Sequence, residues 1–399
     1  MVALRICIAA NLMYPSQPRL RRMAEALVDH GHSVDILCLR APGQQPEEVY
    51  NGVSVVRLPV PHYQGGRGAA YLREYATFFT RVSAELWRRH RRKPYDLVQT
   101  PNPPDALVFS SLPLKLRGVP LILDLRELTP ELFISRFGLG ANSGFVRLLR
   151  LQERLSCAYA DSVLILHERH RRIMAGRGVR NDKMTQVMNC PDERLFDPAR
   201  VPPRRAPDGR FVVVHNGGIF RRYGIDLLVE SVARVRDEIP GIELHLYGTG
   251  DFEQEVRRQA ADLGLAGVVH FHGHQPLETM PAAIAAADVG VVPMRRDVFT
   301  DCVLSTKLLE YVALGVPAIS SRTLTNADYF DDSMVAFFDS DDASALAQRL
   351  LETYRDPQAS QARAARARTF TEQNNWRTES ERHRLLIEQL VQRRKKSKQ

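Results

Sequence analysis

Long apolar runs are missing from the 399-residue sequence, and none reaches the ~18 consecutive apolar residues that a membrane-spanning helix needs. Cysteine is scarce: five residues are spread along the chain, at spacings that suit neither a disulfide framework nor a zinc finger. The first apolar stretch contains Arg5 and lacks a small-residue cleavage site, so we do not expect a signal peptide. Together these absences lead us to expect a protein of the reducing cytoplasm.

The composition is otherwise that of a globular protein, with 44% apolar and 25% charged residues, which excludes a disordered or collagen-like chain. The length suits two domains of roughly 150–200 residues each. The 55 basic residues exceed the 46 acidic ones by nine, which favours an anionic partner. That partner is a phosphate-bearing substrate, a membrane surface or a nucleic acid, and composition alone leaves the three open.

Short apolar runs alternate with amphipathic segments through the first half of the chain. After the first run, Leu20, Met23, Ala24 and Leu27 recur at the spacing of a helix face. We expect strands at 5–10, 33–39, 53–58, 96–100, 120–125 and 162–166. Apolar strands that alternate with helices indicate a parallel sheet covered on both faces.

A second series of the same kind follows a proline-rich stretch. Its helix has Ile225, Leu228, Val229 and Val232 on one face, and its strands are expected at 211–217, 242–248, 268–273, 288–294, 317–321 and 334–339. We therefore expect an α/β protein of two doubly wound, Rossmann-like domains that face each other across a cleft, with the ligand beyond the carboxyl ends of the strands. The expected parts are an N-terminal domain (1–196), a linker (197–210), a C-terminal domain (211–375) and a helix with a basic tail that packs back on the first domain (376–399).

The segment TDCVLSTKLLEYVALGVPAISS (300–321) places Lys307 and Glu310 three residues apart on one face of a short helix. A cation in the first turn of a helix is electrostatically unfavourable unless an anion binds there. Backbone N–H groups from Ser305 to Leu308, together with the Lys307 ammonium group, would bind a diphosphate, while Glu310 would accept hydrogen bonds from a ribose. A surface ion pair worth a few tenths of a kcal/mol is the alternative interpretation.

A second segment, HNGGIFRRYGIDLLVESV (215–232), puts Gly217 and Gly218 between a strand and a helix, with Arg221 and Arg222 in the loop. Close backbone approach and guanidinium groups are what a phosphate needs. The sequence has no G-x-G-x-x-G, so a nicotinamide cofactor is not favoured.

These two segments, with LYGTGD, FHGHQP and AADVGVVP, resemble the retaining glycosyltransferases of family 4 (group 1), which have the GT-B fold; the similarity covers nearly the whole chain. The resemblance implies that Glu310 holds the donor ribose, and that Arg222 (or Arg221) and Lys307 neutralise the donor diphosphate. It also implies that the loop around 271–276 holds the base through its backbone. The donor-binding residues expected besides these three are Gly217, Gly218, Arg221, Gly273, Asp301, Ser305, Thr306 and Leu308. We expect no metal and no cofactor beyond the nucleotide-sugar co-substrate.

The sequence departs from the family pattern in places. Cys302 stands at the first position of the family's acidic pair, so Asp301, one residue away, is the substitute carboxylate. Arg126 replaces the usual histidine, where it would bind an anionic acceptor or the leaving diphosphate, or else form a surface pair with Glu127 or Glu131. The candidates on the acceptor side are Asn11, Tyr14, Arg19, Arg126, Glu127 and Glu168. The departures motivate an alternative, a catalytically inactive GT-B-like binding or regulatory subunit; a nucleotide-sugar epimerase is a further one, disfavoured by Lys307 and Glu310.

The segment 71–93 carries an apolar stripe of Tyr71, Tyr75, Phe78, Val82 and Leu86, and a dense group of basic residues follows. Such a stripe is either a core face or a membrane anchor, and the basic residues would suit anionic lipid headgroups. Nucleic-acid binding is not expected, because only this segment combines basic and aromatic residues. We expect sugar transfer from a nucleotide sugar to a hydroxyl acceptor, in cell-surface polysaccharide, glycoconjugate or glycosylated-metabolite biosynthesis. A lipid-linked acceptor and a peripheral position on the inner membrane face are compatible with this expectation.

Overall fold

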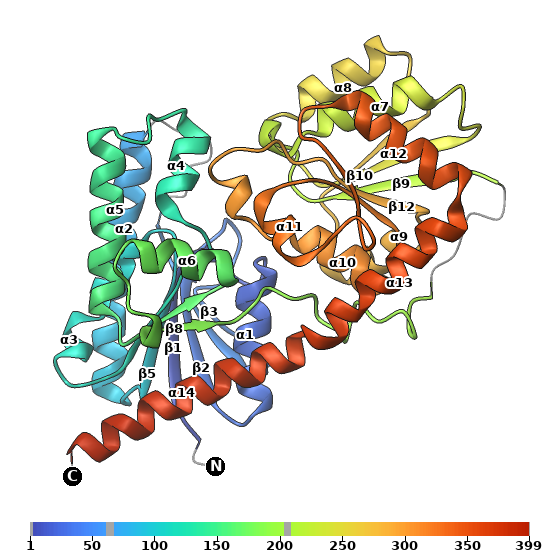
Figure 1. Ribbon diagram of the computed structural model, residues 1–399. Coiled ribbons are helices and arrows are strands. Elements are labelled where there is room, and N and C mark those ends of the chain that lie inside the picture. Colours follow the sequence, from blue (N-terminus) through green and yellow to red (C-terminus); the bar gives the residue numbers. More distant parts are fainter. Residues whose placement is uncertain (1–2, 61–67, 203–208, 399) are drawn as a thin grey trace. The chain divides into compact units, whose positions relative to one another are not determined.

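The computed structural model describes residues 3–60, 68–202 and 209–398 (Figure 1). The chain divides into two compact units, one of Met1–Asn189 with Thr378–Gln399 and one of Cys190–Arg377. Residues 190–196, which we expected in the first domain, belong to the second unit. Part of the expected linker, 203–208, lies outside the described residues.

The first unit is built on an eight-stranded sheet with the order β3-β4-β2-β1-β5-β6-β7-β8. Its strands are β1 (Arg5–Met13), β2 (Ser33–Leu39), β3 (Glu47–Tyr50), β4 (Val53–Leu58), β5 (Leu97–Pro101), β6 (Leu121–Asp124), β7 (Ser162–Ile165) and β8 (Met184–Gln186). All neighbouring pairs are parallel except β3 with β4. The six expected strands are confirmed, whereas β3 and β8 were not expected because both are short edge strands without a buried apolar run.

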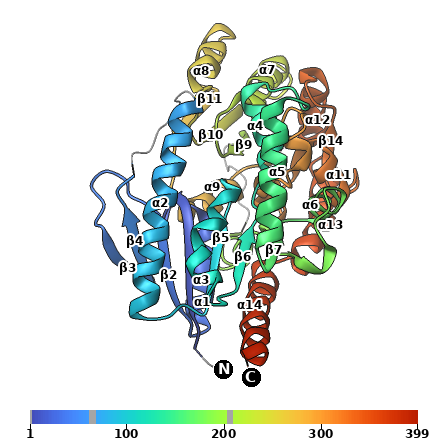
Figure 2. The same cartoon turned by 90° about the vertical axis from the view of Figure 1, so that its left-hand side faces the viewer.

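Helices cover both faces of this sheet. Those of the first unit are α1 (Pro18–Asp29), α2 (Gly68–Arg92), α3 (Leu112–Lys115), α4 (Thr129–Phe137), α5 (Gly144–Tyr159), α6 (Glu168–Gly176), two 3₁₀ helices, η1 (Asp105–Ser111) and η2 (Asn181–Lys183), and most of α14 (Trp376–Lys398). Helices α2, α3 and α5 lie on one face, and α1 and α14 on the other (Figures 1 and 2). A buried hydrogen bond anchors α14, because the Nε2 atom of His383 lies 2.8 Å from the Oε1 atom of Gln99 on β5.

The stripe of 71–93 lies on α2 and faces the core. Phe78, Val82 and Leu86 are fully buried, and Tyr75 is partly exposed. The Tyr71 side chain lies outside the described residues. The core interpretation of this stripe is therefore confirmed for its central residues, which have no surface to offer a lipid. Binding of anionic headgroups by the basic residues stays a prediction.

The second unit has a six-stranded, fully parallel sheet with the order β11-β10-β9-β12-β13-β14. Its strands are β9 (Phe211–Asn216), β10 (Ile242–Tyr247), β11 (Val269–Gly273), β12 (Val289–Val292), β13 (Ala318–Ser321) and β14 (Ala336–Phe338), and all six were expected. Its helices are η3 (Arg221–Tyr223), α7 (Ile225–Val235), α8 (Glu253–Asp262), η4 (Leu277–Thr279), α9 (Met280–Ala285), η5 (Thr300–Cys302), α10 (Thr306–Leu314), α11 (Leu324–Tyr329), α12 (Ala343–Arg355) and α13 (Pro357–Gln373). Because the strands are parallel, their carboxyl ends share one edge, and the loops that follow β9, β10 and β11 lie together there.

Candidate donor-binding site

Glycine loops meet closely at the carboxyl ends of β9, β10 and β11. The Gly217 N–H donates to the Tyr247 carbonyl oxygen (2.7 Å), and the Gly248 N–H donates to that of Gly273 (2.7 Å). A Cβ atom on Gly248, whose φ is +140°, would lie 1.9 Å from the Gly217 carbonyl oxygen. Only glycine permits this conformation and this approach. The loops therefore form a floor of bare backbone, which a ligand can approach closely.

Lys307 lies in the first turn of α10 and extends over this floor. A Cβ atom on Gly217 would lie 2.2 Å from the Lys307 Cε atom, and the Lys307 Nζ atom is 4.6 Å from the centre of the Tyr223 ring. Burial lowers the pKa of the Lys307 ammonium group and the charge of Arg222 lowers it further, while the charge of Glu310 acts in the opposite direction. Two cations and one carboxylate thus interact electrostatically here. An additional anion would relieve the repulsion between the cations.

Arg222 is held among aromatic rings. Its guanidinium carbon lies 5.2 Å from the ring centre of Phe220, 5.3 Å from that of Tyr223 and 5.7 Å from that of Phe299. Within the part of the chain that the structure describes, its buried Nε atom has no hydrogen-bond partner. The Arg295 N–H donates to the Arg222 carbonyl oxygen (2.9 Å) and anchors the loop. The guanidinium group is therefore positioned by packing and retains an unused donor for an anion.

Glu310 is buried at the same edge, with 9% of its surface exposed. Its Oε2 atom accepts a hydrogen bond from the Asn216 Nδ2 atom (2.6 Å), at the end of β9. The Asn216 N–H donates to the hydroxyl oxygen of Tyr311 (3.4 Å), whose ring occupies the space that a Cβ atom on Gly290 would fill. This network orients the carboxylate. Sequence reasoning missed Asn216, although a polar residue at the end of a buried strand and before two glycines is a recognisable signal.

The expected row of open amides at the start of α10 is wrong in two of its four positions. The Ser305 N–H donates to the Asn326 Oδ1 atom (3.2 Å), and the Leu308 N–H donates to the Ser305 Oγ atom (3.5 Å). Ser305 is the N-cap, and an N-cap side chain satisfies a first-turn amide of its own helix. For the amides of Thr306 and Lys307, a contact with the diphosphate stays a prediction.

Asp301 already has partners in this structure. Its Oδ1 atom is 3.0 Å from the Arg296 Nε atom and accepts a hydrogen bond from the Leu324 N–H (2.9 Å). Cys302 is buried, and its Sγ atom lies 3.2 Å from the Val298 carbonyl oxygen. A sugar contact by Asp301 therefore stays a prediction, and it would compete with the ion pair to Arg296.

His215, which sequence reasoning also missed, lies near Lys307 and is fully buried on β9. Burial, followed by the charge of Lys307, lowers the pKa of its imidazole to about 3. Its Nδ1 atom lies 2.8 Å from the Val291 carbonyl oxygen. The ring is therefore neutral at physiological pH and adds no charge below the ammonium group.

In the first unit, the structure brings Arg19 and Arg126 together at the carboxyl ends of the strands. The Arg19 Nη2 atom is 3.1 Å from the Asp124 Oδ1 atom, and the Arg126 Nη2 atom donates to the Gln17 Oε1 atom (3.2 Å). Burial lowers the pKa of Arg126, Asp124 opposes this shift and Arg19 adds to it. Among the described residues, the buried Nε atom of Arg126 and the Nε and Nη1 atoms of Arg19 have no hydrogen-bond partner. Glu131, the expected alternative partner of Arg126, pairs instead with Arg177 (2.5 Å).

The other acceptor-side candidates have separate surroundings. The Asn11 Nδ2 atom donates to Glu74 (3.3 Å), and the Tyr14 side chain is fully buried, so only the backbone of Tyr14 could meet a ligand. The backbone of Glu127 is held by the Asn102 side chain. Glu168 begins α6, where its carboxylate is half-exposed and pairs with Arg171 (3.1 Å). The structure does not place Glu168 with Arg19.

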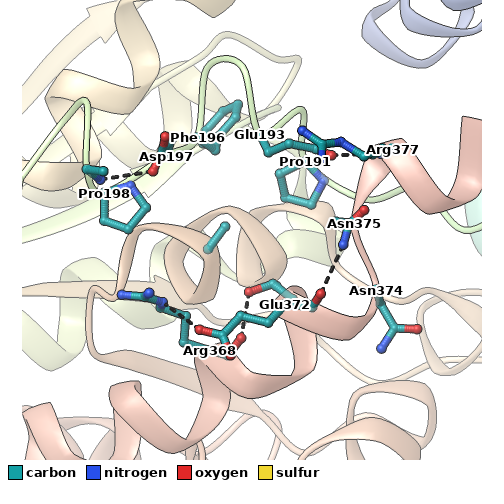
Figure 3. A pocket seen from close by; sticks show the side chains of 13 residues that line it. Pro191, Glu193, Phe196, Asp197, Pro198, Arg368, Glu372, Asn374, Asn375 and Arg377 are labelled. Carbon is teal, nitrogen blue, oxygen red and sulfur yellow. Dashed lines mark hydrogen bonds and ion pairs between the residues drawn. The ribbon is translucent and has the colours of Figure 1, made fainter.

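A pocket of about 540 Å³ opens elsewhere on the second unit (Figure 3). It surrounds the start of α14, where the Glu193 carboxylate accepts hydrogen bonds from the N–H groups of Trp376 (3.1 Å) and Arg377 (2.7 Å). A carboxylate that accepts from first-turn amides caps a helix. None of the expected site residues lines this pocket, which we therefore assign to the packing of α13 and α14.

Comparison with known families matches both halves of the chain. Residues 16–190 match the model of a glycosyl transferase 4-like domain, and residues 210–356 match that of the glycosyl transferases group 1. A GDP-mannose-dependent alpha-(1-6)-phosphatidylinositol monomannoside mannosyltransferase of Mycolicibacterium smegmatis is 31% identical over 192 residues, 47% of this chain and 49% of that protein. A lipopolysaccharide core biosynthesis glycosyltransferase of Rhizobium meliloti is 36% identical over 112 residues, 28% of this chain and 30% of that protein. The match thus spans half or less of these curated relatives.

Solved structures resemble the whole chain in fold. Sucrose-phosphate synthase from Thermosynechococcus elongatus superposes with a TM-score of 0.76 at 20% identity, covering 97% of this chain and 99% of that one. Anabaena HepE in complex with UDP superposes with a TM-score of 0.70 at 15% identity, covering 97% and 100%. At such identities the likeness establishes the architecture of two Rossmann-like domains and nothing finer.

Proposed function

Because the chain belongs to the group 1 glycosyltransferases, with the GT-B fold, we propose that it transfers a sugar from a nucleotide-diphosphate sugar to an acceptor hydroxyl with retention of the anomeric configuration. The observation that carries the proposal is the arrangement of Lys307, Arg222 and Glu310 at the carboxyl edge of the second sheet. Lys307 and Arg222 supply positive charge above a glycine floor, and Asn216 orients the Glu310 carboxylate beside them.

The chemistry of the donor explains this arrangement. When the bond between the sugar and the diphosphate breaks, negative charge accumulates on the leaving diphosphate. Cations that are held in place before the reaction stabilise that charge without reorganisation. Lys307 and Arg222 are such cations. The first turn of α10 carries the positive end of the helix dipole, which also favours a negative charge there. Glu310 accepts hydrogen bonds from two ribose hydroxyls and fixes the nucleotide.

For the acceptor, we propose a molecule with an anionic group near its reacting hydroxyl. Arg19 and Arg126 support this choice, because Arg19 is buried, Arg126 is partly buried, and among the described residues both have N–H groups without a hydrogen-bond partner near the Asp124 carboxylate. A curated relative is named for transfer to a phosphatidylinositol monomannoside, whose chemistry fits this description. An Arg126→Gln variant is expected to raise the KM for a phosphorylated acceptor and to leave the KM for its dephosphorylated form unchanged; equal effects on both would contradict the assignment.

We also propose that the enzyme acts peripherally at an anionic membrane surface, through α5. Its inward face is buried, whereas Leu148, Leu151 and Leu155 lie on the outward face and are each between 51% and 59% exposed. Three arginines flank this stripe: Arg147, Arg150 and Arg154. Apolar side chains between basic ones suit the boundary between acyl chains and anionic headgroups. No helix in the described part of the chain has the length and hydropathy to cross a bilayer.

Vesicle co-sedimentation of the full chain tests this surface. We expect binding to phosphatidylglycerol vesicles, weak binding to phosphatidylcholine vesicles, and loss of binding when the three leucines are replaced by serine. Leu385→Ser is the matched control, because Leu385 is 41% exposed on α14, on the other face of the sheet, and should not affect binding. Unchanged binding of the triple variant would refute the α5 surface.

The proposed activity itself is tested by thermal-shift screening against UDP, GDP, ADP and TDP sugars, followed by a transfer assay with the stabilising donor. A ligand present at 100 times its Kd raises the unfolding free energy by about 2.7 kcal/mol. Stabilisation by one nucleotide sugar together with product formation supports the proposal. Stabilisation without transfer to any phosphorylated or lipid-linked acceptor would favour a catalytically inactive binding subunit, and epimerised donor in the absence of acceptor would favour an epimerase.

A further inference from the structure

Imidazole and carboxylate side chains gather on one face of β10 and β11, the strands that lead to Gly248 and Gly273. Glu243, His245 and Tyr247 alternate along β10, and His270 and His272 alternate along β11. The two strands pair in parallel with His245 opposite His270, so these side chains point to the same side of the sheet. His245 and His270 are 25 positions apart in sequence, and the pairing of the strands brings them together.

This face of the sheet is partly open, unlike the other. Ile242, Leu244 and Leu246 point to the opposite side and are buried in the core with α7 and α8. Glu243, His245 and His270 retain partial exposure. The strand β11 is also the edge of the sheet. An ion from solvent can therefore reach these side chains without the opening of a core.

The ligand atoms are close enough to share one ion. One ligand atom from each of Glu243, His245 and His270 lies within 4.8 Å of the other two. The His245 Nε2 atom is 3.1 Å from the Glu243 Oε2 atom, the separation expected of neighbouring ligands around a tetrahedral ion with bonds near 2 Å. Among the described residues, the buried His270 Nε2 atom has no hydrogen-bond partner.

The surroundings of His245 also suit a bound cation. The His272 Nε2 atom lies 3.0 Å from the His245 Nδ1 atom, so it can accept the Nδ1 proton when the His245 Nε2 lone pair binds an ion. An outer partner of this kind orients a metal-binding histidine.

We propose that Glu243, His245 and His270 form a Zn²⁺ site that joins the edge strand β11 to β10, with His272 as the positioning residue. Two imidazoles and one carboxylate are a zinc ligand set, with water at the fourth position. Arg210, which donates to Glu243 (2.8 Å), turns outward when the ion takes this oxygen. The site is separate from sugar transfer, whose cations are Lys307 and Arg222, and it stabilises the strand that leads to the Gly273 turn.

Isothermal titration of Zn²⁺ into the EDTA-treated full chain tests the site. We expect one ion per chain, a higher Tm with the ion bound, and loss of this binding in His245→Ala and His270→Ala. His272→Ala should weaken binding about tenfold, as removal of an outer partner does. His274→Ala is the matched control, since His274 is exposed and outside the cluster, and it should bind as the unaltered chain does.

Co²⁺ provides a second readout that does not depend on stability. Its visible absorption in the unaltered chain should be that of a tetrahedral nitrogen and oxygen site, and His270→Gln, a milder change, should abolish it. Equal Tm values for the variants and the unaltered chain, all free of metal, verify that the variants fold. The absence of stoichiometric binding, or binding that persists in both His245→Ala and His270→Ala, would overturn the site. Sugar transfer measured in EDTA reports separately on the proposed function.

Discussion

Replacing Lys307 by methionine should separate the catalytic role of its charge from its structural role. The substitution keeps an apolar stem of similar length against Gly217 and removes the ammonium group. In the free protein that group is partly buried, and its pKa is lowered by burial and by Arg222. Its charge is therefore not a source of stability before the donor binds.

The expected magnitudes follow from the contacts of Lys307. Loss of the interaction with the Tyr223 ring, 4.6 Å away, costs about 0.5–1 kcal/mol, and relief of the repulsion with Arg222 offsets part of this. The free energy of unfolding should change by less than about 1 kcal/mol. Loss of a charged contact to the diphosphate should weaken donor binding by about 1.5–3 kcal/mol. Because the diphosphate gains charge as the bond breaks, kcat should fall by about 10²–10³.

The measurements are denaturant unfolding, calorimetric titration of the donor, and steady-state transfer. Lys115→Met is the matched control: it removes the same group from a partly exposed ion pair with Asp161 in the other unit and should leave kcat unchanged. Turnover and donor affinity of Lys307→Met within about threefold of the unaltered protein would refute the role of Lys307. So would a large loss of stability, since the charge would then be structural.

Three further predictions concern the same scaffold. Glu310→Gln keeps an oxygen for Asn216 but loses the carboxylate, so the donor Kd should rise by about tenfold or more with little change in Tm; an unchanged Kd by titration would refute the ribose contact. Gly248→Ala should destabilise the chain by about 3 kcal/mol or more, because its Cβ atom would meet the backbone oxygen of Gly217; a Tm within a degree or two would contradict the described loop. Burial raises the pKa of Glu153 to about 7, above its usual 4.5, so its protonated form is favoured in the folded state. This contribution to stability is complete below about pH 4.5 and is lost as the pH rises through about 7. Relative to Glu153→Gln, the free energy of unfolding of the unaltered chain should fall by about 1–3 kcal/mol over that range. A difference between the two proteins that does not change with pH would refute the shift.

The fold could be predicted because its signal is local. Buried parallel strands are continuous apolar runs, so β2 and β4 were expected with their observed bounds, and the helix between β9 and β10 was visible in its periodicity. The edge strand β3 was not predicted, since its residues are exposed or partly so and carry no such pattern.

The candidate site could be predicted only where its residues are close in sequence. Lys307 and Glu310 share a helix face, so their spacing was informative. The partner of Glu310, Asn216, is 94 residues away, and Asn326, which occupies the Ser305 amide, is 21 residues away. Contacts of this kind depend on strand order and loop packing, and one sequence carries no direct signal for them.

The histidine cluster shows the same limit. His245 and His270 lie on different strands, so no spacing within one strand brings the three ligands together. Their proximity follows from the register of β10 and β11, which becomes known only with the structure.

The most direct measurement of the central claim is a crystal structure of the full chain with the nucleoside diphosphate that stabilises it most. The account predicts diphosphate oxygens within hydrogen-bond distance of the Lys307 ammonium and Arg222 guanidinium groups, with the ribose hydroxyls on the Glu310 carboxylate. A diphosphate bound elsewhere, such as in the pocket beside Glu193, with these three side chains untouched, would contradict it.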